Sequence, residues 1–343
     1  MTAMYPLLFK PIYKQKVWGG TRLEKLGRKL PDGNVGESWE LVDLARTSAS
    51  GGGGGSERSV VENGELAGST LHELMDTAGA ALMGDLKPNA FGEFPLLVKF
   101  LDANEDLSVQ VHPSAAYARE HDDAFLKSEA WYVIDCEPDA VIYKGMQPGV
   151  TPAQLREALK VNTAEAVVPL LVTVAVKPGE CHYLPSGTCH ALGRGVLAAE
   201  VQTPSDTTFR VFDWGRTGRE LHVDKAIENL TFGPCDASRY EPDATLQGQY
   251  GPIRRLVSCE YFRMDEVKLS AGFEQAVSYR QPTLWMIIAG GGAIACDGAG
   301  VTQVSEGRTV LLPPGMKGAR LTLSADTTLI EVTFPQAEPV RSA

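Results

Sequence analysis

The sequence predicts a mainly β protein made of two jelly-roll barrels with a few short helices. The first observation behind this prediction is a turn pattern, G-x5-P-x-G-x2-H, that runs from Gly179 to His190. The pattern recurs from Gly307 and keeps Pro313 and Gly315. The second observation is that short runs rich in β-branched and aromatic residues surround both copies, which favours strands. A length of 343 residues suits two domains.

The two copies of the pattern differ at their last position, which is His190 in the first copy and Gly318 in the second. We therefore expect two cupin-like barrels, of which only the first is equipped for chemistry. The predicted catalytic, metal-binding domain spans residues 1–245, with a short helical insertion around 151–165. The predicted C-terminal domain spans 246–343 and lacks metal ligands. Pro- and Gly-rich sequence near 233–252 is typical of such a boundary.

The N-terminal third combines strand patterns with one helix signal. GESWELVD (residues 36–43) alternates as a strand does. Gly51–Gly55 predicts a flexible loop, and it is not a phosphate loop because no Gly-Lys-Ser/Thr follows it. Thr70 and Glu73 fit a capping box at the start of a short helix.

The next strands carry candidate ligands. FPLLVKFLDANEDLSVQVHPS (residues 94–114) predicts two strands around a turn at 104–106. Alternation places Gln110 and His112 on one face and Val109 and Val111 on the other. After a polar, helical excursion, SEAWYVIDCEPDAVIYKG (residues 128–145) predicts a hairpin with Glu129 at its start.

The clearest helix of the sequence is TPAQLREALK (residues 151–160). Thr151 is its expected N-cap, Pro152 occupies the first helical position and Gln154 completes a capping box. A strand, VTVAVKPG, then leads to the Gly179 pattern, and the strands VLAAEVQ and TTFRVFDW follow it with Glu200 and Arg210 inside them.

Composition limits the possible partners and compartments. A net charge of −11 argues against a nucleic-acid or anionic-membrane surface, so an anionic substrate would need a local basic pocket. The first residues show no signal-peptide pattern, and no apolar run is long enough to cross a bilayer. Six cysteines without a C-x-x-C pair predict reduced thiols and a cytoplasmic protein.

Gln110, His112, Glu129 and His190 form a candidate metal site. Together they offer two nitrogen and two oxygen ligands, which suits Zn²⁺, Fe²⁺, Mn²⁺ or Co²⁺. A single histidine is more often a hydrogen-bonded core residue, but the Q-x-H step and the motif histidine occur in the right strand order for a shared site.

The motifs FLDANEDLSVQVHP, KSEAWYVI, PSGTCHALG and EVQTPSDTTFRVFDWGR resemble class I mannose-6-phosphate isomerases, specifically the short bacterial form. FKPIYKQKVWGG and GESWELVD extend the resemblance over nearly the whole chain. The resemblance implies one zinc ion per chain, held by Gln110, His112, Glu129 and His190, although other divalent metals could replace it. It also implies a catalytic Arg210 and conserved lysines at Lys99 and Lys127. The Gly51–Gly55 loop and the intervening Ser128 depart from the family pattern.

The reaction that the resemblance implies interconverts mannose 6-phosphate and fructose 6-phosphate through a cis-enediol. One proton moves between C1 and C2, and a divalent metal stabilises the charge that develops on the enediolate oxygens. Glu200 is the candidate base, with a metal-bound hydroxide as its rival. Arg210 would act on the enediolate or on the phosphate, and Lys99 and Lys127 would bind the phosphate.

Two other classes stay open, a metal-dependent cupin dioxygenase and a sugar-binding cupin that has lost its chemistry. Sites of the first class favour His-rich ligation, and a Q-x-H step with a distant glutamate is unusual for them. The joint presence of Lys99, Glu200 and Arg210 disfavours the second class. The expected partner is a small sugar phosphate, with no nucleic acid and no membrane, and the expected protein is a monomer or a homodimer.

Overall fold

The computed structural model describes residues 3–50 and 55–335 and has two compact units. One unit comprises Pro11–Ser59 and Asn89–Ala237; we call it the site unit. The other comprises the residues up to Lys10, Val60–Pro88 and the residues from Ser238 onward; we call it the second unit. Most of the predicted Gly51–Gly55 loop lies outside the described residues.

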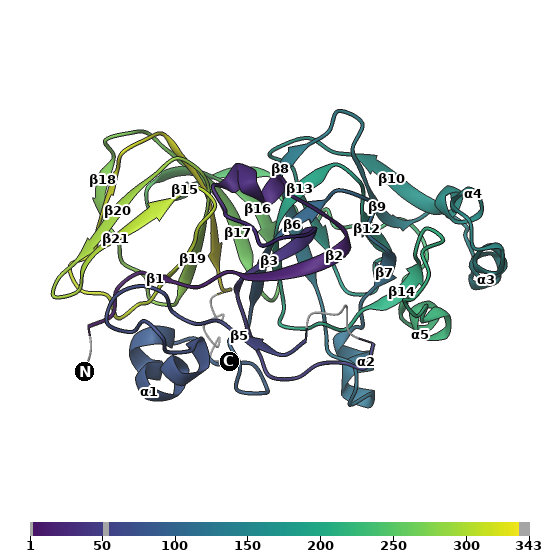
Figure 1. Ribbon diagram of the computed structural model, residues 1–343, viewed down its shortest axis with the longest axis horizontal. Helices are drawn as coiled ribbons and strands as arrows, with labels where there is room; N and C mark the ends of the chain where they lie inside the picture. Colours follow the sequence, from purple (N-terminus) through teal and green to yellow (C-terminus); the bar gives the residue numbers. More distant parts are fainter. Residues whose placement is uncertain (1–2, 51–54, 336–343) are drawn as a thin grey trace, which may run out of the picture. The chain divides into compact units, whose positions relative to one another are not determined.

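The site unit contains two large antiparallel sheets and one small strand pair (Figure 1). The six-stranded sheet has the order β11-β8-β13-β6-β3-β2 and consists of β2 Ile12–Gly20, β3 Val35–Leu41, β6 Leu97–Ala103, β8 Glu129–Cys136, β11 Cys181–Leu184 and β13 Val196–Gln202. The five-stranded sheet has the order β10-β9-β12-β7-β14 and consists of β7 Val109–Val111, β9 Val141–Met146, β10 Leu171–Ala175, β12 His190–Leu192 and β14 Phe209–Phe212. A small pair joins β4 Asp43–Leu44 to β5 Glu57–Arg58.

The two sheets share one apolar core. Trp131, Val133 and Ala198 of the six-stranded sheet pack in the same cluster as Ile142 and Leu192 of the five-stranded sheet. The inner face of each sheet is therefore buried against the other, as in a sandwich.

Helices cover the outer face of the five-stranded sheet. Val109 and Val111 on β7 pack there with Leu155 and Leu159 of α3 and with Ala226 of α5. The alternation along β7 then directs Gln110 to the inner face, as the sequence predicts. The helical elements of this unit are η1 Arg22–Leu26, α2 Ala115–Glu120, α3 Pro152–Val161, α4 Ala164–Val167, η2 Val168–Leu170 and α5 Val223–Asn229 (Figure 1).

The predicted local signals are present. Thr151 and Gln154 form the capping box of α3, and Pro152 is its first residue. Gly187, in the turn between β11 and β12, has a φ of 86°, and its N–H donates to the carbonyl oxygen of His112 at 2.9 Å. This turn directs β12 into the sheet with His190 as its first residue.

The second unit contains a seven-stranded and a four-stranded antiparallel sheet. The first has the order β1-β22-β19-β24-β17-β16-β15 and consists of β1 Leu7–Leu8, β15 Ala244–Gly248, β16 Gly251–Ser258, β17 Arg263–Leu269, β19 Thr283–Ala289, β22 Thr309–Leu312 and β24 Thr327–Thr333. The second has the order β18-β23-β20-β21 and consists of β18 Glu274–Ala276, β20 Gly291–Cys296, β21 Gly300–Ser305 and β23 Arg320–Leu323.

Helix α1, Leu71–Met83, belongs to the second unit and begins at the predicted capping box of Thr70 and Glu73. It lies against the second copy of the turn pattern, where a Cβ on Gly315 would come within 2.7 Å of the Ala81 carbonyl oxygen. Gly315 is therefore required by this close approach.

The mainly β prediction is confirmed, whereas the finer prediction of two jelly-roll barrels stays a prediction. In the described part of the chain, no helix combines the length and the apolar character that a bilayer crossing requires.

Candidate active site

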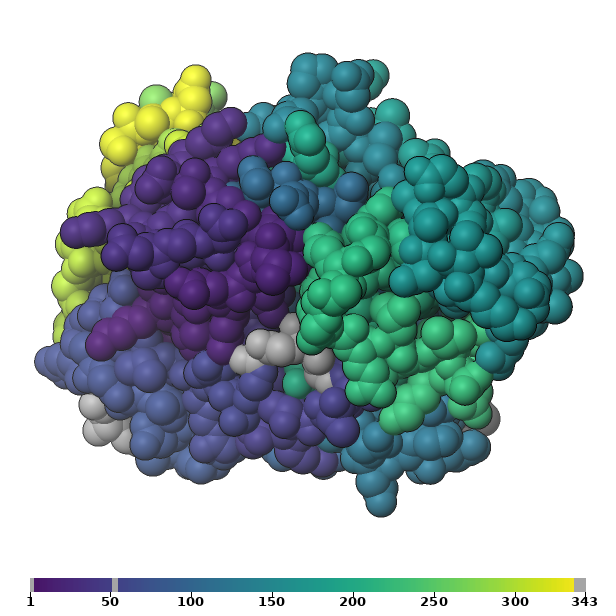
Figure 2. Space-filling view, turned by 45° about the vertical axis from the view of Figure 1, so that its right-hand side comes forward, coloured from purple at the N-terminus to yellow at the C-terminus, as the bar shows by residue number. Residues whose placement is uncertain are grey.

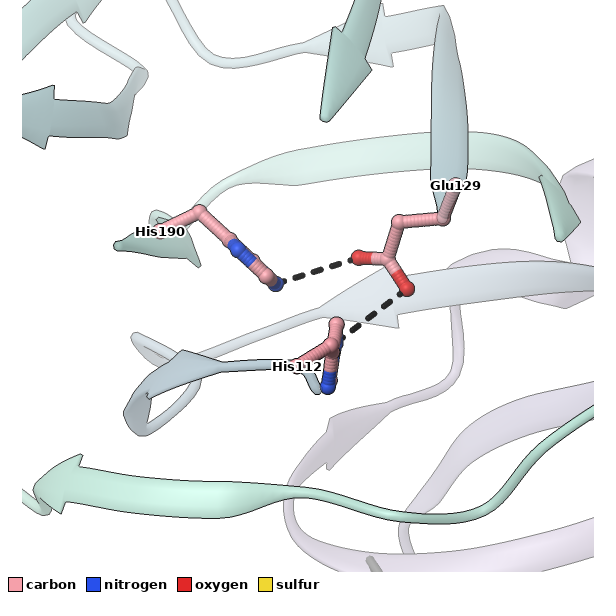
Figure 3. A group of neighbouring side chains, drawn as sticks. All are labelled: His112, Glu129 and His190. Carbon is pink, nitrogen blue, oxygen red and sulfur yellow. Dashed lines mark ion pairs between the residues drawn. The ribbon is translucent and has the colours of Figure 1, made fainter. Parts of the chain in front are cut away.

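His112, Glu129 and His190 meet in the interior of the site unit (Figure 3). Their ligand atoms all lie within 4.8 Å of one another, and all three side chains are buried. Glu129 Oε1 is 3.2 Å from His190 Nε2, and Glu129 Oε2 is 3.4 Å from His112 Nε2. The three residues come from β8, from β12 and from the end of β7, so neither sheet alone could form the cluster.

Main-chain carbonyls orient both imidazoles. His112 Nδ1 is 2.9 Å from the Thr207 carbonyl oxygen, and His190 Nδ1 is 2.8 Å from that of Thr188. A carbonyl can only accept, so Nδ1 carries the proton and Nε2 presents its lone pair toward Glu129. Burial, followed by the charge of Lys127, lowers the pKa of His112 to about 3, which keeps its ring neutral.

The cluster has unmet acceptor atoms. Among the described residues, His112 Nε2 and both carboxylate oxygens of Glu129 are buried without a hydrogen bond of good geometry. Burial would raise the pKa of Glu129, but the charge of the adjacent Lys127 opposes burial, and the pKa lies well below its usual range. Two lone pairs that face an ionised carboxylate repel it unless a cation lies between them, so the donor set fits a divalent metal.

Gln110 is a neighbour of the cluster. It pairs across the sheet with His190 on one side and with Arg210 on the other, so the three side chains share the inner face. Its Nε2 lies 3.4 Å from His190 Nε2. A half-turn of the amide would present its oxygen there instead, which is the atom a metal would need.

A pocket lies directly above the cluster. Three of its lining residues contact the cluster: Lys127 Nζ is 3.0 Å from Glu129 Oε2, Gln110 is the neighbour of His190, and the Trp131 ring lies edge-on to His190. The full lining is Lys16, Trp18, Glu37, Trp39, Lys99, Leu101, Leu107, Ser108, Gln110, Lys127, Trp131, Glu200, Ser205, Asp206, Thr208, Arg210 and Arg219. In the surface view, purple atoms from the N-terminal part of the chain and green atoms from the part near residue 210 lie next to each other, and both parts contribute lining residues (Figure 2).

This pocket is cationic in a protein whose net charge is −11. Its cations are Lys16, Lys99, Lys127, Arg210 and Arg219, and its carboxylates are Glu37, Glu200 and Asp206. The excess of positive charge meets the requirement that an anionic substrate would impose on an acidic protein.

Lys99 and Glu200 form a buried ion pair on the pocket wall. They are direct partners between β6 and β13, and Lys99 Nζ is 2.9 Å from Glu200 Oε1. The Trp131 indole N–H donates to Glu200 Oε2 at 2.9 Å. Lys99 also donates to Gln202 Oε1 at 2.7 Å, so both charged side chains are held in place.

Arg210 also lines the pocket, on the strand next to Gln110. Its guanidinium donates to the Glu220 carbonyl oxygen at 2.8 Å, whereas its buried Nε–H has no hydrogen-bond partner among the described residues. Burial and the nearby Arg219 lower its pKa, although an arginine stays protonated in a protein. A buried cation with an unmet donor is suited to receive an anion.

Four charged residues of this pocket were not predicted from the sequence: Lys16, Glu37, Asp206 and Arg219. Glu37 lies within GESWELVD and Asp206 lies between Glu200 and Arg210, so both were near recognised motifs. Alternation in the first motif could have placed Glu37 and Trp39 on one face, but only the pairing of β3 with β6 brings that face to Lys99.

The fold and the site define a class, that of mainly β proteins with a buried candidate metal cluster beneath a cationic pocket. Residues 7–137 match the family model described as phosphomannose isomerase type I, catalytic domain. Mannose-6-phosphate isomerase ManA of Bacillus subtilis is 36% identical over 91% of this chain and 94% of its own length. The mannose-6-phosphate isomerase of Streptococcus mutans is 36% identical over 91% and 93% of the two chains.

Solved structures agree with these relatives. The mannose 6-phosphate isomerase structure from Bacillus subtilis superimposes with a TM-score of 0.82 at 31% identity, covering 96% of this chain and all of the other. A phosphomannose isomerase structure from Salmonella typhimurium, at 16% identity and a TM-score of 0.73, shows the same fold. The chain belongs to the type I mannose-6-phosphate isomerase family, and the family resemblance predicted from the sequence is confirmed.

Proposed function

We propose that this protein is a metal-dependent mannose-6-phosphate isomerase that interconverts mannose 6-phosphate and fructose 6-phosphate. The observation that carries the proposal is the buried cluster of His112, Glu129 and His190 beneath a cationic pocket. An aldose–ketose isomerase needs both parts, because the reacting carbonyl requires an electrophile and the phosphate requires cations. Family membership supports the same substrate.

The proposed metal is Zn²⁺, held by His112, Glu129, His190 and Gln110. Two imidazole nitrogens and a carboxylate are the ligands of many catalytic zinc sites, and a fourth, neutral amide ligand leaves the ion strongly Lewis-acidic. When bound, the metal would polarise the substrate oxygens that become negatively charged in the enediolate. The hydrogen bonds from Nδ1 to the Thr207 and Thr188 carbonyls fix the ligating tautomer.

Glu200 is the proposed base that moves the proton between C1 and C2. It lines the pocket, and the contacts with Lys99 and the Trp131 indole stabilise its carboxylate in one orientation. Asp206 is another carboxylate that lines the pocket, and burial raises its pKa. Glu200→Gln and Asp206→Asn, compared in exchange of the C2 proton with solvent, distinguish the two.

The proposed role of Arg210 is to stabilise the enediolate, and Lys99 and Lys127 are proposed to bind substrate. The pairing of Arg210 with Gln110, and of Gln110 with His190, supports this role, because the three residues share the inner face. Lys127 contacts Glu129 and lines the pocket, so one ammonium reaches both the cluster and the substrate space.

We also propose a jelly-roll architecture for each of the two units. The site unit would be a catalytic cupin-like jelly roll, and the second unit a jelly roll without metal ligands, in which Gly318 stands at the position of His190. We also propose a cytoplasmic location and a monomeric or homodimeric protein.

The test is a coupled assay that measures fructose 6-phosphate formed from mannose 6-phosphate. Chelation should abolish the activity and Zn²⁺ should restore it. Bound Fe²⁺ with oxygen consumption would instead indicate a cupin dioxygenase. Bound metal with sugar binding but no turnover would indicate a non-catalytic cupin.

A further inference from the structure

Four side chains of alternating charge line one wall of the pocket in the order Lys16, Glu37, Lys99 and Glu200. Lys16 Nζ is 3.1 Å from Glu37 Oε1, and Glu37 Oε2 is 3.8 Å from Lys99 Nζ. Lys99 is in turn 2.9 Å from Glu200. The ammonium of Lys99 therefore lies between two carboxylates.

The strand register holds this arrangement in place. Lys99 on β6 pairs with Trp39 on β3 and with Glu200 on β13, so the three side chains project from one face. The Trp39 indole N–H donates to Glu37 Oε2 at 2.7 Å and fixes that carboxylate. Gln202, whose amide N–H group donates to two carbonyls at 2.8 Å, presents its oxygen to Lys99.

Glu37 is ionised in this setting. Burial would raise its pKa, but Lys16, Lys99 and the hydrogen bond from Trp39 outweigh burial and lower the pKa to about 2. Lys99 thus lies 2.9 Å from the Glu200 carboxylate and 3.8 Å from the ionised Glu37 carboxylate, so the attraction between Lys99 and Glu200 is partly balanced by the weaker, more distant contact with Glu37.

We propose that Glu37 is a positioning residue that shares the Lys99 ammonium with Glu200, so that the Glu200 carboxylate stays available for proton transfer. This inference rests on the proposed isomerase function. Without the charge of Glu37, Glu200 would be the carboxylate that alone pairs with Lys99, beside the neutral Gln202 oxygen, and this ion pair would have to loosen each time Glu200 takes a proton. Glu37 itself does not touch the reacting carbons.

Glu37→Gln tests the proposal because it removes the charge and keeps the shape. Proton transfer by a positioned side chain contributes about 10²–10⁴ to a rate, and a weakened base loses part of that, so we expect kcat to fall about tenfold. KM for mannose 6-phosphate should change less than about threefold, since the loss falls on the transition state. Wild-type kcat in Glu37→Gln would refute the proposal.

A double variant separates this role from mere neutralisation of Lys16. If Glu37 only neutralises Lys16, Lys16→Met combined with Glu37→Gln should regain the wild-type kcat, and that result would overturn the proposal. We expect kcat of the double variant to stay low. Glu57→Gln is the matched control. Glu57 pairs at 2.6 Å with Lys14, which lies on strand β2 like Lys16, but Glu57 does not line the pocket.

A readout that needs no turnover tests the contact itself. The ¹⁵N-detected ammonium signal of Lys99, assigned by its loss in Lys99→Met, should shift or broaden in Glu37→Gln. An unchanged signal would contradict the shared ammonium even if the wild-type protein proved inactive. An inactive wild type with a shifted signal would instead overturn the proposed function and leave the contact established.

Discussion

Arg210→Ala is expected to lower kcat for mannose 6-phosphate by about 10²–10³ and to leave KM within about threefold of the wild-type value. The magnitude follows from removing one donor that stabilises developing oxyanion charge, which costs about 2.7–4 kcal/mol in enzymes where it has been isolated. The structure supports a role of Arg210 in stabilising the enediolate. Arg210 shares the inner face with Gln110 and His190, and its buried Nε–H has no hydrogen-bond partner among the described residues.

The folded state should tolerate this substitution. Within the described part of the chain, the Arg210 side chain donates one hydrogen bond, to the Glu220 carbonyl, whereas its strand is held by main-chain pairing with β7. Thermal unfolding should confirm that the variant is folded before its kinetics are compared. Arg194→Ala is the control, since Arg194 is exposed and does not line the pocket.

Steady-state kinetics of Arg210→Ala decide between two roles. The enediolate charge exists only near the transition state. If Arg210 stabilises that charge, removing Arg210 lowers kcat. A phosphate carries its charge throughout, so losing a phosphate contact raises KM. A raised KM with unchanged kcat would refute the reasoning and assign Arg210 to substrate binding, as a neighbour of Arg219.

Three further predictions concern the metal, the second unit and acid stability. His190→Ala should purify with little metal, and a full divalent ion per chain by elemental analysis would refute the assigned ligand set. Deletion of residues 253–343 should give aggregated protein, because it removes β22, the partner of Leu7–Leu8, and the packing of α1; a soluble truncate with unchanged kinetics would contradict this. The pKa of Glu37 is about 2 when folded against an ordinary 4.5, so Glu37 contributes stability, on the order of 3 kcal/mol, that is present above pH 4.5 and lost as the pH falls toward 2. The difference in the free energy of unfolding between wild type and Glu37→Gln should therefore shrink in that range, and a constant difference in acid denaturation would exclude the ion-pair explanation.

The helix caps, the turn at Gly187 and the alternation along β7 could be predicted from the sequence. Capping boxes at Thr70 and Thr151 and the left-handed Gly187 depend only on residues a few positions apart, so their signals are complete within a short segment. The alternation that turns Gln110 away from Val109 and Val111 is equally local, and the structure confirms it. The motifs around the ligands carried the family assignment for the same reason.

The contacts across strands were decided only by the tertiary structure. Sequence pattern gives the face of each strand but not its neighbours, so it could not show that Glu37 on β3 and Glu200 on β13 lie on either side of Lys99 on β6. It also could not show that Arg219 joins Arg210 in one pocket. The sequence by itself determined which residues could ligate a metal and which faces they occupy, because both follow from residue type and period. Which charges balance one another was set by strand order and register, since electrostatic energy depends on distances that only the folded chain defines.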